Sequence, residues 1–275
     1  MRNSLFLRVA PVVAIAAFAA TASAQEIGTA GVSIAGEGTN RAALFTQSAY
    51  VAPQGSFGIG FQAAGRRASM DGDELTVSAM VLSGFYGLTS NLSIGAYVPY
   101  ARISADIGGE EGSETGMADA GVFGRYQAFR SSTGMTKFAV GVEATLPTGD
   151  ETFGSDDPAY ALSGALSHRS GSWNLHIVPA VAIIKDLDPT MHFNVAAVRA
   201  MSPRMALSGE ILTEFGGAVA DTDDEGSKNI DLASGIRYRM TSSSAMDFGL
   251  SYNLSSNVDP RPTTLGAYLG FNWAF

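Results

Sequence analysis

The last eleven residues of the chain alternate without a break between apolar side chains and small or polar ones. The apolar series is Leu265, Ala267, Leu269, Phe271, Trp273 and Phe275, and the other series is Gly266, Tyr268, Gly270, Asn272 and Ala274. Because successive side chains of a β-strand leave opposite faces of the sheet, this pattern predicts a strand with one apolar face. Such a face must be covered by a protein core or by lipid.

The same alternation recurs along most of the chain. It appears in residues 57–62, 75–81, 92–98, 119–127, 137–146, 160–169, 173–183, 191–197, 207–215, 230–239 and 246–254. Together with the last segment these make twelve predicted strands. The apolar series of each is expected on the outer surface, including Leu75, Val77, Ala79 and Val81 in the second strand.

A closed barrel is the fold that this pattern favours. The chain is 46% hydrophobic, yet after residue 24 no apolar run is long enough for a membrane helix. Within lipid, strands satisfy their backbone polar groups only in a closed sheet. We therefore predict an all-β fold, a transmembrane up-and-down antiparallel β-barrel of about 12 strands over residues 53–275. A secreted β-sandwich is the alternative, but its outer faces would be polar throughout.

The N-terminal residues predict export. Arg2 and Arg8 precede an apolar run, and Ala22-Ser23-Ala24 follows it, which is the pattern of a cleaved signal peptide over residues 1–24. A retained membrane helix is the alternative, but the run is too short to span a bilayer. The chain has no cysteine, so we expect no acyl anchor and no disulfide. Residues 25–52 are expected to form a periplasmic tail or a plug within the barrel, and the tail is favoured.

The predicted connections alternate in length. Short ones fall at residues 87–91, 131–135, 170–172, 202–204 and 241–244, and longer ones at 69–74, 106–116, 148–158, 186–190, 216–228 and 255–263. In barrels with an even number of strands the short turns and both termini face the periplasm. Most acidic residues lie in the longer set, so the extracellular rim should be negative.

That acidic rim is interpreted as solvated surface. The alternative is that its carboxylates share Mg²⁺ or Ca²⁺ with the phosphates of lipopolysaccharide, because hard cations prefer oxygen ligands. Asp221 to Gly226 resembles the start of a calcium loop, but the twelfth position, where a glutamate belongs, is Leu232. We therefore expect no specific metal site and no cofactor.

Two resemblances extend this interpretation. A final strand with Phe271, Trp273 and Phe275 resembles the last strand of Gram-negative outer-membrane barrels, which implies that these residues are the signal read by the barrel-insertion machinery. The motifs YGLTSNLSIG (86–95), VPY (98–100), GMADAG (116–121) and LPTGD (146–150) resemble, in order and spacing, the barrel family labelled MetA pathway of phenol degradation. This second resemblance runs from about Ala52 to Phe275 and departs from the family pattern at Met117-Ala118. It implies an outer-membrane barrel that moves small, often aromatic or apolar, molecules.

The inward series of the strands carries charges of both signs. The candidate pore-lining residues are Arg66, Asp119, Arg125, Lys137, Glu143, Arg169, His176, His192, Glu210, Glu214, Asp231, Arg237, Arg239 and Asp247. These charges either pair and fill the lumen or line a hydrated pore. Twelve strands exceed the eight that side chains alone can fill but are fewer than in porins with a wide channel, which predicts a narrow pathway or an occluded pocket. Arg125, Glu143 and Arg237 are expected to tune passage.

Our functional prediction is a channel for small, aromatic or apolar solutes in the cell outer membrane. The alternative is a structural or adhesive barrel with a closed lumen and no transport. The expected partners are outer-membrane lipid, lipopolysaccharide, the insertion machinery and a small-molecule solute. With a formal net charge of −9, the chain is not expected to bind nucleic acid.

We do not expect an enzyme. An outer-membrane phospholipase needs a serine, a histidine and a polar orienting residue on its lipid-facing wall. Only three histidines occur in the chain. His176 and His192 fall on the inward series, and His168 lies at a predicted periplasmic turn. No phosphate-binding glycine loop or His-Glu-x-x-His motif is present.

Overall fold

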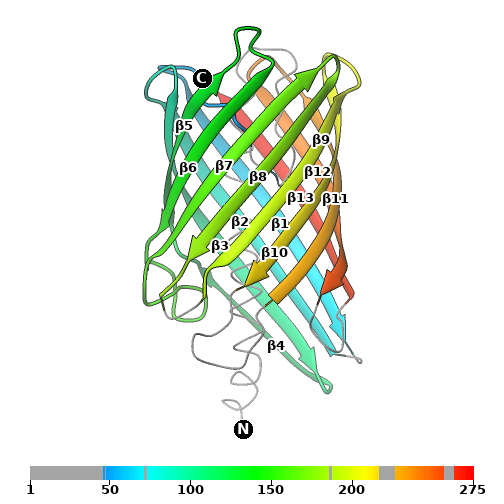
Figure 1. The fold of residues 1–275 in the computed structure, drawn as a ribbon. Coiled ribbons are helices and arrows are strands. Elements are labelled where there is room, and N and C mark those ends of the chain that lie inside the picture. The colour runs from blue at the N-terminus through cyan, green and yellow to red at the C-terminus, as the bar shows by residue number, and fades with distance from the viewer. Residues whose placement is uncertain (1–45, 47, 71–72, 186–187, 217–226, 257–262) are drawn as a thin grey trace.

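The computed structural model describes residues 46, 48–70, 73–185, 188–216, 227–256 and 263–275, and they form an all-β structure (Figure 1). The strands are β1 (Phe57–Met70), β2 (Asp73–Gly87), β3 (Leu92–Ile107), β4 (Glu110–Met117), β5 (Gly121–Arg130), β6 (Thr136–Thr145), β7 (Ala159–Ser170), β8 (Trp173–Ile183), β9 (Thr190–Ala200), β10 (Met205–Gly216), β11 (Ser227–Arg239), β12 (Ser244–Ser256) and β13 (Thr263–Ala274). Among these residues no helix is long and apolar enough to cross a bilayer.

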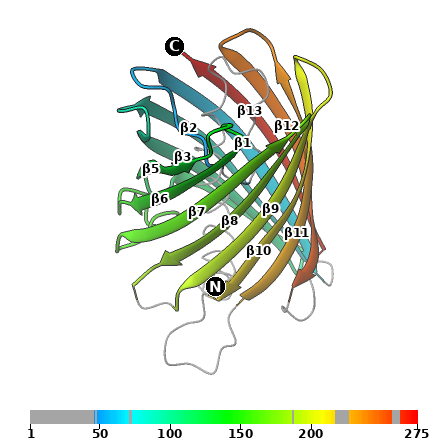
Figure 2. The same cartoon turned by 45° about the horizontal axis from the view of Figure 1, so that its top comes forward.

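The strands close into a barrel of twelve antiparallel strands, as the alternation predicted. Apart from β4 and β5, strands that follow one another in the chain pair with each other, and β1 pairs with β13 over most of its length, from Gly58 with Ala274 to Ser69 with Thr263. β3 pairs with β4 along its second half and with β5 along its first half, so β4 and β5 are two parts of one interrupted strand. Figure 2 shows the tilted strands encircling a lumen.

One predicted connection is instead mostly strand. We expected a loop over 106–116, but β3 and β4 continue as a hairpin that turns at Gly108 and Gly109, both at positive φ. Sequence alternation missed it because the residues from Glu110 to Gly116 are polar or small on both faces. Such a strand carries no apolar stripe when both of its faces meet water. The hairpin projects beyond the end of the barrel in Figure 1.

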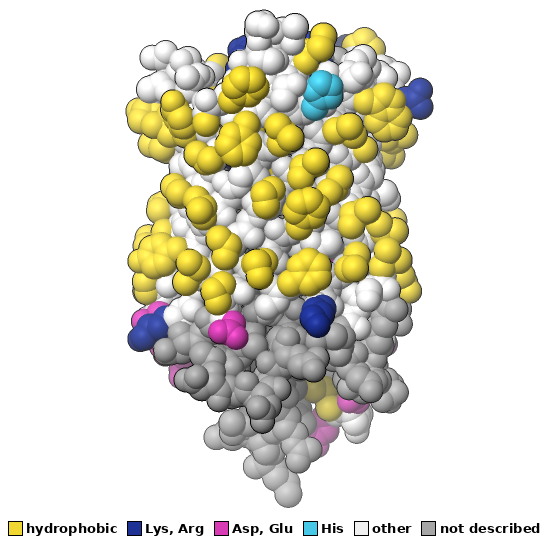
Figure 3. Space-filling view, in the orientation of Figure 1, with side chains coloured by type: hydrophobic (Ala, Val, Ile, Leu, Met, Phe, Trp, Pro, Cys, Tyr) yellow, Lys and Arg dark blue, Asp and Glu magenta, His cyan; other side chains and the backbone are white. Residues whose placement is uncertain are grey.

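Large apolar side chains cover the outer surface. They form bands around the barrel wall, above the charged side chains at the lower end of the view in Figure 3. An apolar belt of this kind is the surface that a transmembrane barrel presents to lipid. The C-terminus lies at one end of the barrel and the acidic β3–β4 hairpin at the other, and the predicted assignment of these ends to the periplasmic and extracellular sides stays a prediction.

In β2 the predicted faces are reversed. Val77, Ala79 and Val81 are buried inside the barrel, whereas Met80 and Leu82 face outward with exposed fractions of 47% and 57%. Both series of this strand are apolar, so alternation alone does not distinguish them. The register with β1 and β3 decides the faces, because a one-residue shift would turn every side chain to the other side.

Candidate functional site

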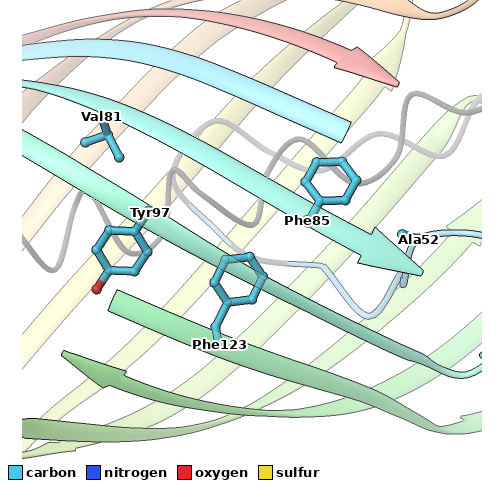
Figure 4. Packing of buried hydrophobic residues seen from close by; sticks show 5 residues of the cluster. All are labelled: Ala52, Val81, Phe85, Tyr97 and Phe123. Atoms are coloured by element: carbon cyan, nitrogen blue, oxygen red, sulfur yellow. The ribbon is translucent and has the colours of Figure 1, made fainter. Parts of the chain in front are cut away.

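One side of the barrel lumen is apolar. Val81 and Phe85 of β2, Tyr97 of β3 and Phe123 of β5 form a buried cluster, here called the aromatic wall. Figure 4 shows these side chains together with Ala52, which precedes the first strand and packs against them. The sequence analysis missed this wall. The available signal was the second apolar series of β2 and the aromatic residues on the inward series of β3 and β5.

Glycines on neighbouring strands hold the three rings of the wall in place. Cβ atoms at Gly58, Gly121 and Gly95 would overlap with the rings of Phe85, Tyr97 and Phe123, respectively. Each ring therefore lies directly over the glycine that faces it on the paired strand, where a larger residue would clash with it. This arrangement explains why the inner faces of β1, β3 and β5 carry glycine at these positions.

Replacing Gly58 by alanine should disrupt the wall. The new methyl group would displace the ring of Phe85 toward the lumen, and overpacking of this kind costs about 1–3 kcal/mol. We expect the Gly58→Ala barrel to unfold at a lower urea concentration than the wild type. Gly209→Ala is the matched control, since a Cβ atom there meets nothing within 4 Å. Equal midpoints for Gly58→Ala and the control would contradict the packing argument.

Apolar residues continue from the wall to the extracellular mouth. Val77 of β2, Ala101 and Ile103 of β3, and Ala118 pack with Phe153 from the β6–β7 loop in a second buried cluster. Since Val77 pairs with Ile103, and Val81 with Pro99, the inward residues of β2 and β3 form one apolar strip along the lumen. A solute entering from outside would meet apolar surface first.

Asp119 fastens the β6–β7 loop over this mouth. It lies in the break between β4 and β5, and its Oδ1 accepts hydrogen bonds from the backbone N–H of Thr148 (3.0 Å) and of Gly149 (2.9 Å). Its Oδ2 accepts from the N–H (2.9 Å) and the hydroxyl (2.7 Å) of Ser155. The predicted pore-lining residue is thus a structural anchor for the loop.

Asp119→Ala should release that loop. Four donors would lose their acceptor, at a cost of roughly 1–3 kcal/mol for each one that stays buried. We expect limited proteolysis of the intact barrel to cut within residues 150–156 much faster than in the wild type. Asp157→Ala, which removes only an exposed ion pair with Lys185, is the control. Unchanged cleavage in Asp119→Ala would show that the loop is held by other contacts.

The opposite side of the lumen is polar. On β11 and β12, Arg237 donates to Asp247 through Nε (2.5 Å) and NH2 (3.0 Å), and Asn272 of β13 donates to the same carboxylate at 3.0 Å. Arg66 of β1 pairs with Asp231 of β11, although β12 and β13 lie between these strands. These ion pairs connect β1 with β11 and β11 with β12 on the inner face, so Arg237 has a structural role. Its predicted part in tuning passage stays a prediction.

The other candidate lumen residues also lie on the inward series of their strands. Buried ones are Arg125, Lys137, His176 and Glu210, and half-buried ones are Glu143, Arg169, His192, Glu214 and Arg239. Glu143 accepts a hydrogen bond from the hydroxyl of Tyr97 at 2.5 Å, which joins it to the aromatic wall. His192 lies directly across from Glu214 in the β9–β10 pairing. Arg239 donates to the carbonyl of Pro203 at 2.5 Å.

Residues 46 and 48–52, which precede β1, lie inside the barrel. We call residues 46 and 48–52 the inner segment. Its backbone makes three hydrogen bonds with the lumen: the N–H of Thr46 donates to Glu210 (2.7 Å), the N–H of Ala49 donates to Ser167 (2.9 Å), and Arg125 donates to the carbonyl of Ser48 (2.9 Å). Strands β10, β7 and β5 thus all bind the segment.

Side chains of the inner segment pack against the same walls. Ala49 is fully buried with Ala139, Ala165 and Val178. Tyr50 lies beneath the ammonium of Lys137, with the nitrogen 3.9 Å from the ring centroid, and meets His176 edge-on at 6.5 Å. For its described part, the region predicted as a tail or a plug therefore occupies the lumen. Residues 25–45 and 47 lie outside the described residues, as does the predicted signal peptide.

His176 contributes to the packing of the inner segment against the lumen wall. Its Nδ1 lies 2.8 Å from the hydroxyl of Ser167, which also accepts the bond from Ala49. The serine and histidine thus face the lumen, not the lipid-facing wall where a phospholipase site would lie. Among the described residues there is no group of three or more histidine or acidic side chains placed to hold a metal ion.

The predicted insertion signal lies on the outer face. Phe271 and Trp273 stack with ring centroids 6.1 Å apart, and Phe275 stacks on Phe57 of β1 at 6.5 Å. The second contact connects the end of β13 with the start of β1, the two strands that close the barrel. Whether the insertion machinery recognises them stays a prediction.

Comparison with known proteins agrees with this architecture. A family model described as "Putative MetA-pathway of phenol degradation" matches residues 47–272. Among curated protein sequences none is significantly similar. The solved COG4313 outer membrane channel from Pseudomonas putida F1 is similar with a TM-score of 0.71 and 16% identity, covering 82% of this chain and 97% of that one. The NanC porin is similar with a TM-score of 0.53 and 11% identity, covering 78% and 98%. At these identities the likeness shows the fold alone.

Proposed function

This chain belongs to the family described as "Putative MetA-pathway of phenol degradation" and is a barrel of the outer membrane, and we propose that it is a channel for small, aromatic or apolar solutes. The observation that carries the proposal is the continuous apolar strip from the extracellular mouth to the aromatic wall. The rings of the wall offer an apolar surface against which the ring of a solute can pack once the space beside them is free.

The inner segment acts as the plug of this channel. It occupies the lumen beside the aromatic wall, so solute passes only when the segment leaves or shifts. Its three hydrogen bonds use backbone groups, and each contributes about 0.5–1.5 kcal/mol, or somewhat more where a charged partner is involved. These contacts and the packing of Ala49 and Tyr50 are non-covalent, so displacement of the segment is reversible in this proposal.

The charged residues divide into two groups in this proposal. Arg237, Asp247, Arg66 and Asp231 hold the wall together through ion pairs. Arg125, Lys137, Glu143 and Glu210 surround the inner segment and line the path once the segment has moved. Outer-membrane lipids cover the apolar belt, lipopolysaccharide contacts the extracellular rim, and the insertion machinery recognises Phe271, Trp273 and Phe275.

Single-channel conductance of the refolded mature chain tests the proposal. Ala49 has no exposed surface and lies among Ala139, Ala165 and Val178, so Ala49→Arg cannot fit and should expel the inner segment. We expect rare, short openings for the wild type and sustained openings for Ala49→Arg, which a small aromatic solute blocks transiently. Ser132→Arg, in an exposed periplasmic turn, should behave like the wild type. A correctly inserted Ala49→Arg barrel that stays silent would indicate a closed, structural lumen.

A further inference from the structure

We propose that β4 binds an extended, positively charged peptide segment of another protein along its outer edge. Among the strands that the structure describes, β4 pairs only with β3, so the side of β4 that faces away from β3 has no neighbouring strand. We call this side the free edge. The hairpin that carries it projects beyond the barrel (Figure 1). Binding at this edge is separate from the proposed function, because no solute needs to pass the lumen.

The hydrogen bonds at the base of β4 show which backbone groups face the free edge. The N–H of Ala118, just after the strand, donates to the carbonyl of Pro99 in β3 (3.0 Å). The N–H of Met117 points the other way and donates to Asp150 Oδ2 (2.7 Å). In an antiparallel pair this direction alternates from one residue to the next. The N–H and carbonyl groups that face the free edge are therefore those of Thr115, Ser113 and Glu111.

The β6–β7 loop already occupies one end of the free edge. Besides accepting the bond from Met117, Asp150 donates its own N–H to the carbonyl of Met117 (2.8 Å). This is the two-bond exchange of a neighbouring strand, with a side-chain oxygen in place of a backbone carbonyl. The edge thus accepts a second chain segment in β geometry, and the stretch from Glu111 to Thr115 remains open for one.

The charge of the hairpin selects the partner. Its paired strands carry four carboxylates, namely Asp106 of β3 and Glu110, Glu111 and Glu114 of β4, but one positive side chain, Arg102. A second copy of this chain that paired β4 with β4 would bring like charges together, which destabilises a sheet. Lysine or arginine side chains on a partner strand would instead be attracted. A basic segment is therefore favoured over a second copy.

Amide hydrogen exchange of the refolded mature chain in a zwitterionic detergent, followed by NMR, tests the free edge. The probe is a short peptide with lysine and threonine at alternate positions. We expect the amides of Ser113 and Thr115 to exchange quickly in the free barrel and about tenfold or more slowly once the peptide is bound. The amides of Gly112 and Glu114 face β3 and should change little. Neither a peptide with glutamate in place of lysine nor a fully N-methylated one should protect them.

Ser113→Pro separates hydrogen bonding along the edge from charge. Proline removes the N–H of Ser113 from the free edge and breaks no bond to β3. We expect the affinity of the lysine peptide, measured by fluorescence anisotropy, to fall about tenfold or more. Ser132→Pro, in an exposed turn at the opposite end, is the matched control and should bind like the wild type. Glu111→Gln/Glu114→Gln keeps the edge and should weaken binding several-fold, an effect that high salt removes.

Several results would overturn this proposal. The edge is not the site if Ser113→Pro binds the lysine peptide as tightly as the wild type, or if the fully N-methylated peptide binds as tightly as the unmodified one. The second comparison uses the wild-type barrel, so it holds even where Ser113→Pro does not fold. The charge assignment is wrong if the glutamate peptide protects the same amides. Slow exchange of Ser113 and Thr115 in the free barrel would show that another part of this chain, or a second copy, already covers the edge.

Discussion

Oxidation of the double variant Ala49→Cys/Ala165→Cys should abolish conductance and solute flux, and a reducing agent should restore them. Ala49 of the inner segment and Ala165 of β7 are both buried in one cluster, and Ala49 also donates to Ser167 on the same strand. A disulfide between them would tether the segment in the lumen. The natural chain has no cysteine, so no other disulfide competes.

The effect is large because the contacts of the segment are non-covalent and can break reversibly, whereas a disulfide stays closed until it is reduced. Each single-cysteine variant is a control that should not respond to oxidant. The double variant Ala49→Cys/Ser132→Cys, whose second cysteine lies in an exposed and distant turn, is a further control for cysteine chemistry alone. Full conductance of the oxidised, cross-linked protein would show that the segment does not gate the lumen.

Asp247→Ala should destabilise the barrel by about 3–5 kcal/mol, because it leaves a buried arginine without its carboxylate. Asp247 has no exposed surface, and Arg237 is 5% exposed. Both nitrogens of Arg237 that reach the carboxylate would lose their acceptor, and so would Asn272 of β13. Since β11, β12 and β13 are all joined here, the loss should appear as a lower urea midpoint for the whole barrel.

A double replacement distinguishes a lost pair from a general packing defect. Arg237→Met/Asp247→Leu removes both charges and should regain most of the stability, because buried ion pairs are often matched by apolar side chains of similar volume. Glu74→Ala breaks the exposed pair with Arg67 and should cost at most about 1 kcal/mol. If the double variant were no more stable than Asp247→Ala, the pair would not explain the loss.

Most strands of the barrel could be predicted because their two faces differ in polarity. An outward apolar series and an inward polar one alternate in strands such as β8 and β13, so local sequence determines both the strand and its faces. β2 was assigned to the wrong faces because both of its series are apolar. β4 was missed because neither of its two series is apolar. In both cases the decisive information lies in pairing with other strands, which alternation does not contain.

The candidate site was predictable only in part. Arg125, Lys137 and Glu210 could be placed on the inward series from the pattern alone. Their shared binding partner, the inner segment, could not be predicted in this way. The inner segment contributes backbone groups, and a backbone N–H or carbonyl leaves no mark in the residue type. The aromatic wall was hidden for a different reason: Tyr97 and Phe123 lie on series expected to be polar, and Phe85 lies on the β2 series that was assigned to the outer face.

Entry of benzenesulfonate into liposomes tests the central claim most directly, since this aromatic anion crosses lipid poorly on its own. Liposomes carrying Ala49→Arg should take it up much faster than protein-free liposomes. The wild type should be intermediate, and the oxidised Ala49→Cys/Ala165→Cys protein should match the protein-free rate. Uptake at the protein-free rate by all three inserted barrels would contradict the account of a plugged channel for small aromatic solutes.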